Sequence, residues 1–135
     1  MSKYAMFYNS KNNDRVYDAD DMTEWLKPFF VTGIFNGGMQ VTANDNMSVT
    51  IAGGYCNIGG KVKKFNEAQT LTIETASGTL NRIDNVILRR DDIERDITLM
   101  IQKGGQADTP TAPALTRSGA YYDLKLAEIY VSAGS

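Results

Sequence analysis

The stretch from Arg82 to Gln102, which reads RIDNVILRRDDIERDITLMIQ, decides the fold. Every second position from Ile97 to Ile101 is an isoleucine or a leucine, and the segment Val86 to Leu88 continues the pattern. A period of two is typical of a β-strand with one buried face, so both halves are predicted to be strands. The charged residues between them, Asp91 to Glu94, are predicted to form the tip of a hairpin.

The same period recurs on both sides of this hairpin. It runs from Met47 to Ala52 and from Thr70 to Ile73 on the N-terminal side, and from Tyr122 to Val131 on the C-terminal side. In the last of these segments the apolar phase slips at Ala127, which predicts a bulge, a bend or a short helical turn.

The order of elements predicts a mainly β protein. About seven or eight short strands with frequent turns, after one N-terminal α-helix, are typical of an antiparallel β-sandwich or a flattened barrel. The length of 135 residues fits a single domain, 1–135. Within it we expect an N-terminal arm (1–17), a helix (18–32), strands (39–103), an extended loop (104–119), and a last strand (120–135) that exits toward a C-terminal region absent from this chain.

The helix is indicated by apolar residues at i, i+3, i+4, i+7 and i+8, which place one stripe along it. The stripe consists of Met22, Trp25, Leu26, Phe29 and Phe30. Asp18 or Asp20 is expected to be the N-cap, and Pro28 predicts a kink or an end near Lys27. From the stripe we expect Trp25, Phe29 and Phe30 to belong to the core.

Composition excludes several kinds of chemistry. The chain has no histidine and one cysteine, so catalytic triads and dyads that need an imidazole, zinc cages and an intramolecular disulfide are all excluded. The net charge of −2 gives no reason to expect nucleic acid. No apolar run is long enough to insert into a membrane. We therefore expect no enzyme, no cofactor and no resident metal, and we expect Cys56 to be a small core residue.

Two acidic clusters are candidates for metal binding or acid catalysis. The first could offer oxygen ligands to calcium, but it lacks the glycine and glutamate of an EF-hand loop, so helix capping is the preferred interpretation. It comprises Asp14, Asp18, Asp20, Asp21 and Glu24. The second could act as paired catalytic acids, but arginines interleave with it, which favours a solvated, salt-bridged turn. It comprises Asp91, Asp92, Glu94 and Asp96.

Aromatic residues gather ahead of the helix. Such a group can pack on its own domain or dock on a neighbour, and interfaces are enriched in tyrosine, tryptophan and phenylalanine. The candidate partner-docking residues are Tyr4, Phe7, Tyr8, Arg15 and Tyr17.

Four motifs in series carry a resemblance to a known family. The first is FYNSKNNDRVYDADDMTEWLKPFFVTGIF, from Phe7 to Phe35. A glycine-punctuated strand pair follows from Met47 to Gly60, and then a hairpin with the pattern RID, VILR, D and R from Arg82 to Gly104. The last motif runs from Pro110 to Gly134 and contains LTR and LAEI. In this order the motifs resemble the opening of a family of tailed-phage tail proteins.

The resemblance implies a non-enzymatic, structural virion protein from a phage or prophage of Gram-positive bacteria. It would be the N-terminal attachment module of a baseplate, tail-fibre or receptor-binding protein, made in the bacterial cytoplasm and located in the virion tail. Its partners would be other tail proteins and further copies of itself, commonly as a homotrimer. Any host cell-wall saccharide would bind through the absent C-terminal part. The alternative is a carbohydrate-binding module that contacts cell-wall glycan directly.

Overall fold

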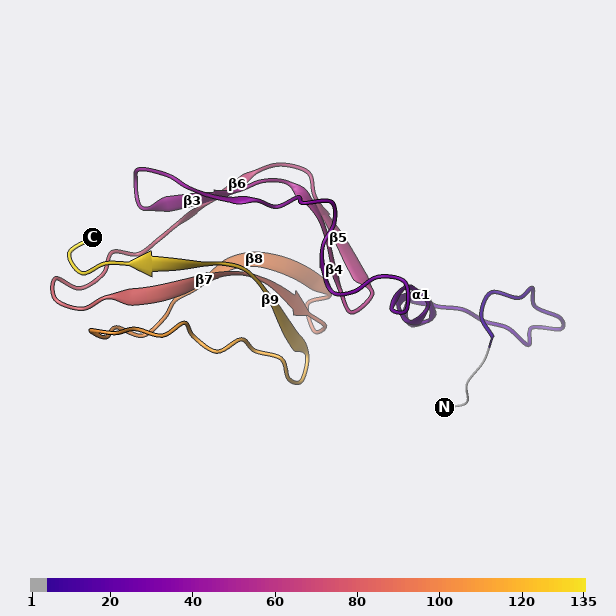
Figure 1. The fold of residues 1–135 in the computed structure, drawn as a ribbon. Coiled ribbons are helices and arrows are strands. Elements are labelled where there is room, and N and C mark those ends of the chain that lie inside the picture. The colour runs from indigo at the N-terminus through magenta and orange to yellow at the C-terminus, as the bar shows by residue number, and fades with distance from the viewer. Residues whose placement is uncertain (1–4) are drawn as a thin grey trace.

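The computed structural model describes residues 5–135 and is mainly β. Within this range it has one helix and nine strands: α1 (Ala19–Leu26), β1 (Gly33–Ile34), β2 (Val41–Ala43), β3 (Ser48–Ile51), β4 (Gly54–Ile58), β5 (Lys61–Phe65), β6 (Gln69–Thr72), β7 (Arg82–Asp91), β8 (Asp96–Gln102) and β9 (Tyr121–Val131). They form three antiparallel sheets, β1-β4-β5, β2-β3-β6 and β8-β7-β9. The sheets stack into sandwich-like layers without closing into a barrel (Figure 1). The predicted fold class is confirmed.

The β7–β8 hairpin is the centre of the main sheet. Its tip is where the sequence predicts it, since Asp91 is opposite Asp96 at the end of the ladder. β9 pairs along the other edge of β7, and the register slips between Val86 and Ile87, opposite Ala127. The predicted break in phase is therefore a β-bulge.

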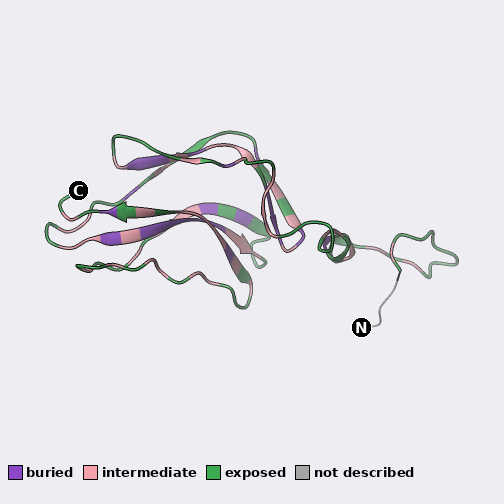
Figure 2. Cartoon of the chain, in the orientation of Figure 1, coloured by how far each residue is buried: buried purple, intermediate pink, exposed green. Residues whose placement is uncertain are grey.

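β7 departs from the half-buried pattern. Val86, Ile87 and Leu88 are all fully buried, so both faces of the strand are covered. One face meets the other sheets, whose core side chains include Ile51, Cys56 and Ile58. Figure 2 shows buried stretches of strand in purple in the facing layers. Cys56 is thus the core residue that was predicted, and burial raises the pKa of its thiol against the opposing influence of Lys63.

Residues 104–119 form an extended strap. Asn85 and Gln102 hold it by donating from their side-chain amides to the carbonyl oxygens of Pro113 and Ala114, at 3.0 and 2.7 Å. The strap begins at Gly104, where a Cβ would lie only 1.9 Å from the carbonyl oxygen of Ile83. Only glycine permits this close approach of two backbones.

Two ion pairs, one buried and one partly buried, join the strands to the strap. Arg82 Nε lies 2.7 Å from Asp84 Oδ1, and this carboxylate also accepts the backbone N–H of Gly104. Arg89 makes the equivalent pair with Asp123 of β9, which in turn accepts the backbone N–H of Thr116. Arg82 and Arg89 of the hairpin motif are therefore structural.

The helix is shorter than the predicted span 18–32, and the expectation about its aromatic stripe is wrong. α1 ends at Leu26, just before Pro28, which cannot continue the helical hydrogen bonds. Trp25, Phe29 and Phe30 are 43%, 64% and 45% exposed, so they do not belong to the core. The reason is position: α1 lies beyond the end of the sheets (Figure 1), and its one buried residue is Thr23, which is not part of the stripe.

Candidate functional site

In the structure the N-terminal arm continues through α1, and residues 5–32 are called the arm below. It starts with a tight loop. The backbone N–H of Lys11 donates to Asp14 Oδ1 at 2.6 Å, and that of Arg15 donates to Ser10 Oγ at 3.4 Å. Asn12 and Asn13 take the left-handed conformation, with φ of 56° and 61°. Asparagine tolerates this conformation better than most residues, so the polar stretch reverses the chain and brings its two sides together.

The reversal assembles a row of aromatic rings. The ring centroids of Phe7 and Tyr17 are 4.8 Å apart, those of Phe7 and Trp25 5.3 Å, and those of Trp25 and Phe29 5.8 Å. The Tyr17 hydroxyl accepts the backbone N–H of Tyr8 at 3.0 Å. Phe7, Tyr17, Trp25 and Phe29 are called the aromatic row below. Rings at these separations stabilise one another, so the row holds its own shape.

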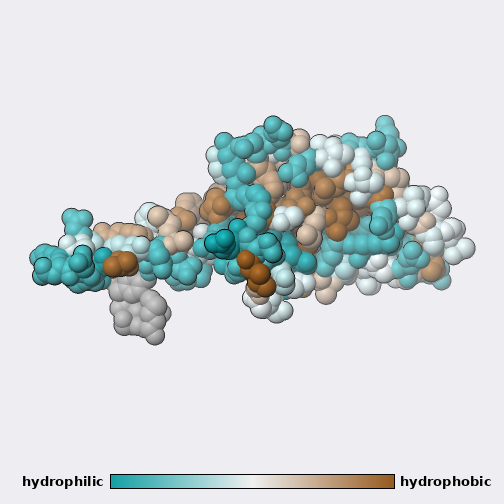
Figure 3. Space-filling view, turned by 180° about the vertical axis from the view of Figure 1, so that it is seen from behind, coloured by the Kyte–Doolittle hydropathy of each residue, from teal (hydrophilic) through white to brown (hydrophobic). Residues whose placement is uncertain are grey.

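The rings of the row contact one another but are only partly covered. Phe7 is 43% exposed, and Tyr8 beside it is 63% exposed. Val16, Met22 and Val31 add aliphatic surface to the same arm. Figure 3 shows tan and brown side chains spread along the arm among hydrophilic ones. Exposed aromatic rings held together in this way are a candidate interaction site.

The base of the arm is fixed to the turn between β4 and β5. Asn57, which is fully buried, donates from Nδ2 to the carbonyl oxygens of Phe30 and Val31, at 3.2 and 3.0 Å. Its Oδ1 accepts the backbone N–H of Gly60 at 2.9 Å. Gly60 itself lies against α1, since a Cβ there would be 2.5 Å from the carbonyl oxygen of Thr23. The sheet β1-β4-β5 therefore fixes the base of the arm, which carries the rings.

The predicted docking residues have different locations. Phe7, Tyr8 and Tyr17 come together as described, and Tyr4 lies outside the described residues. Arg15 is half-buried and its side chain makes no ion pair with residues 5–135. The structure adds Trp25 and Phe29, which sequence reasoning had assigned to the core. An apolar helical stripe suits a core and a docking surface equally well, so the sequence has no signal that separates the two.

The first acidic cluster caps the helix. Asp18 is the N-cap, and it exchanges side-chain-to-backbone hydrogen bonds with Asp21 in a capping box. The preferred interpretation of this cluster is confirmed. Among residues 5–135, no three carboxylate or thiol side chains come close enough together to hold a metal ion.

The second acidic cluster lies at the β7–β8 turn as a set of separate pairs. Asp92 binds Arg90, and Asp96 binds Lys63, each with a nitrogen–oxygen distance of 2.7 Å. The hydrogen bond from Lys63 lowers the pKa of Asp96, with help from the backbone N–H of Ile97. A general acid needs the opposite shift, so the pairing favours the salt-bridged turn.

Comparison with known proteins adds no relative. No protein-family model, no curated protein and no solved structure matches this chain. Within the described part of the chain, no helix has the length and apolar character needed to span a membrane.

Proposed function

We propose that this protein is a non-enzymatic attachment module that docks through the aromatic row to another protein. The observation that carries the proposal is the exposure of rings that are already held in place. Trp25 and Phe29 lie edge to face, yet Phe29 remains 64% exposed. Rigid aromatic side chains lose little conformational entropy on binding and dominate the energy of many interfaces.

The arrangement of the chain favours a connector. The arm projects from one end of the sandwich, and the C-terminal residues lie at the opposite end (Figure 1). The last residues are tied to the sandwich, because Ser135 accepts the backbone N–H of Ala76 through its carbonyl oxygen, at 2.9 Å. A module with this geometry can hold a partner at one end and carry a further segment at the other.

We further propose that the partner is a phage tail protein, and that this module belongs to the tail of a virion. This part rests on the order of the four motifs, which resembles that of baseplate and tail-fibre proteins. In such an assembly the arm would meet the tail tip, further copies of this chain would complete a trimer, and receptor-binding parts would follow the C-terminal end.

The experiment is a pull-down with defined partners. The chain is co-expressed with the tail proteins encoded by neighbouring genes, and the molar mass of each complex is measured by light scattering. We expect the double substitution Trp25→Ala/Phe29→Ala to abolish a complex that the wild-type chain forms. Tyr130→Ala is the matched control, since Tyr130 is an equally exposed aromatic on β9, outside the arm. Equal loss in both variants, or a wild-type chain that binds none of these proteins, would refute the proposal.

One observation favours the alternative of a glycan-binding module: exposed aromatic rings are what sugars stack on. However, the rings of Trp25 and Phe29 are inclined at 69°, and those of Phe7 and Trp25 at 76°, so they do not make a flat platform. Titration of cell-wall oligosaccharides, followed by tryptophan fluorescence, separates the two functions. Trp25 is the single tryptophan and is kept as the probe, so a saturable change that Phe29→Ala weakens would favour the glycan.

A further inference from the structure

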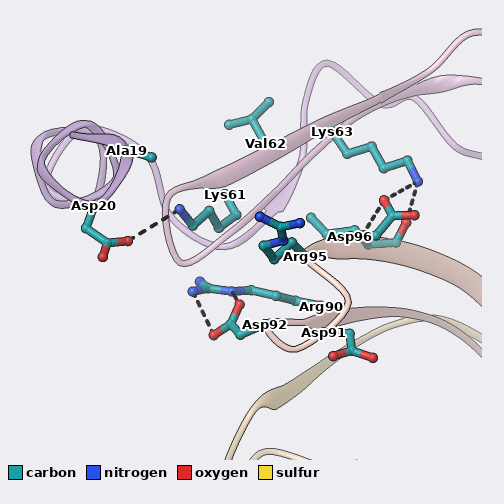
Figure 4. A pocket seen from close by; sticks show the side chains of 11 residues that line it. Ala19, Asp20, Lys61, Val62, Lys63, Arg90, Asp91, Asp92, Arg95 and Asp96 are labelled. Carbon is teal, nitrogen blue, oxygen red and sulfur yellow. Dashed lines mark hydrogen bonds and ion pairs between the residues drawn. The ribbon is translucent and has the colours of Figure 1, made fainter.

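A second feature of the molecule lies at the base of the arm. A cavity of about 760 Å³ opens between α1, the β4–β5 turn and the β7–β8 hairpin. Figure 4 shows charged side chains from all three elements around it. They are Asp20, Lys61, Lys63, Arg90, Asp91, Asp92, Arg95 and Asp96.

Three of the four carboxylates of the cavity are bound to groups on its walls, and the fourth, Asp20, faces Lys61. Asp91 Oδ1 accepts the backbone N–H groups of Ile93 and Glu94, at 2.9 and 3.0 Å. Asp92 forms two hydrogen bonds with Arg90, at 2.7 and 3.1 Å, while Asp96 binds Lys63 at 2.7 Å. These bonds fix the turn. The cationic side chains of the cavity that lack a close acceptor are therefore the groups left to bind a ligand.

Two cations have capacity to spare. Lys61 Nζ lies 3.7 Å from Asp20 Oδ1, which is beyond a good hydrogen bond. The Arg95 side chain makes no hydrogen bond or ion pair with any residue in the described range 5–135. In Figure 4 the Arg95 side chain lies between Lys61, which reaches toward Asp20, and Arg90, which is paired with Asp92.

The backbone at Arg95 is unusual as well. Its φ is 57°, the left-handed region that glycine and asparagine prefer at the end of such a turn. An arginine here carries a conformational cost, and no contact of its side chain in the described residues offsets that cost. Strain of this kind is a reason to look for a functional role.

We propose that this cavity binds a phosphate group, with Arg95 and Lys61 as its donors. A guanidinium and an ammonium that approach from different sides suit a tetrahedral anion, which offers oxygens in several directions. A carboxylate has two oxygens in one plane and would satisfy fewer of these donors. The cavity exceeds the size of the anion and falls in the range of small-molecule sites, so a phosphate ester fits as well as free phosphate. The site is separate from the aromatic row and does not depend on the docking function.

The test is an NMR titration of the full chain at constant ionic strength. The probes are inorganic phosphate, glucose 1-phosphate and glucose. We expect saturable shifts of the amides of 59–63 and 90–97 with both phosphates, and at least about tenfold weaker binding of glucose. Tighter binding of glucose 1-phosphate would assign the site to an ester, and equal binding would assign it to the free anion.

Arg95→Gly is the decisive variant, because glycine suits the left-handed backbone and the fold is kept. We expect it to weaken phosphate binding by about tenfold or more. Lys64→Ala is the control: Lys64 is on β5 with Lys61 but lies over the Tyr55 ring, outside the cavity lining, so binding should stay within about twofold. Undiminished binding by Arg95→Gly, an equal loss in Lys64→Ala, or equal binding of glucose and the phosphates would overturn the proposal.

Discussion

Removing the Asp84 carboxylate is expected to destabilise the protein severely. The side chains of Arg82 and Asp84 are 0% and 1% exposed, and Asp84→Ala would leave the guanidinium buried without its counter-charge. It would also remove the acceptor for the backbone N–H of Gly104, 2.9 Å away. Breaking a buried pair from one side costs about 3–5 kcal/mol. Domains are stable by only about 5–15 kcal/mol, so a large part of the total would be lost.

The chain contains its own control for this effect. Arg90 and Asp92 have the same spacing and the same 2.7 Å contact between Nε and Oδ1, but the Asp92 side chain is 50% exposed. Asp92→Ala should therefore cost no more than about 1 kcal/mol. Urea unfolding, followed by circular dichroism, measures both free energies of unfolding. A loss below about 1 kcal/mol for Asp84→Ala, or equal losses in the two variants, would refute the reasoning about burial.

Two further outcomes are expected. Burial, the largest influence, raises the pKa of Asp123, but hydrogen bonds from Arg89 and Thr116 with nearby positive charge lower it overall. The stabilisation by this carboxylate is therefore fully present above its unfolded pKa of about 3.9 and is lost as the pH falls through its folded pKa. In Asp123→Asn, the free energy of unfolding should consequently fall less steeply at acidic pH than in the wild-type chain. Asn57→Ala should cost about 1–3 kcal/mol and speed chymotrypsin cleavage at the base of the arm, because two carbonyls lose their donor. Asn66→Ala, at an exposed position, should change neither, and cleavage at wild-type rate in Asn57→Ala would count against this role.

Much of the strand architecture could be predicted from local patterns. The period of two located the central hairpin, the charged run located its tip, and the change of phase at Ala127 located the bulge. These features depend on which face of a strand each side chain occupies, and that follows from the order of residues alone.

The docking surface was predicted in part. The aromatic character of Phe7 and Tyr17 was visible, but the conclusion that Trp25 and Phe29 are buried was wrong. A stripe at helical spacing records only that one face is apolar. Whether that face meets a sheet or solvent depends on where the helix is placed, which is set by Asn57 and Gly60 far along the chain.

The sequence by itself determined the class of structure: the alternation of apolar and polar residues, the turns and the capping aspartate are local properties, and local geometry suffices for them. Tertiary structure alone decided which charges are buried, which rings stay exposed and which cations face a common cavity. Arg82 and Arg90 look alike in the sequence, each two residues before an aspartate. Arg82 is fully buried and donates to the carbonyl oxygens of Glu74 and Thr75, whereas Arg90 lines an open cavity. Burial depends on what other segments of the chain place against each side chain.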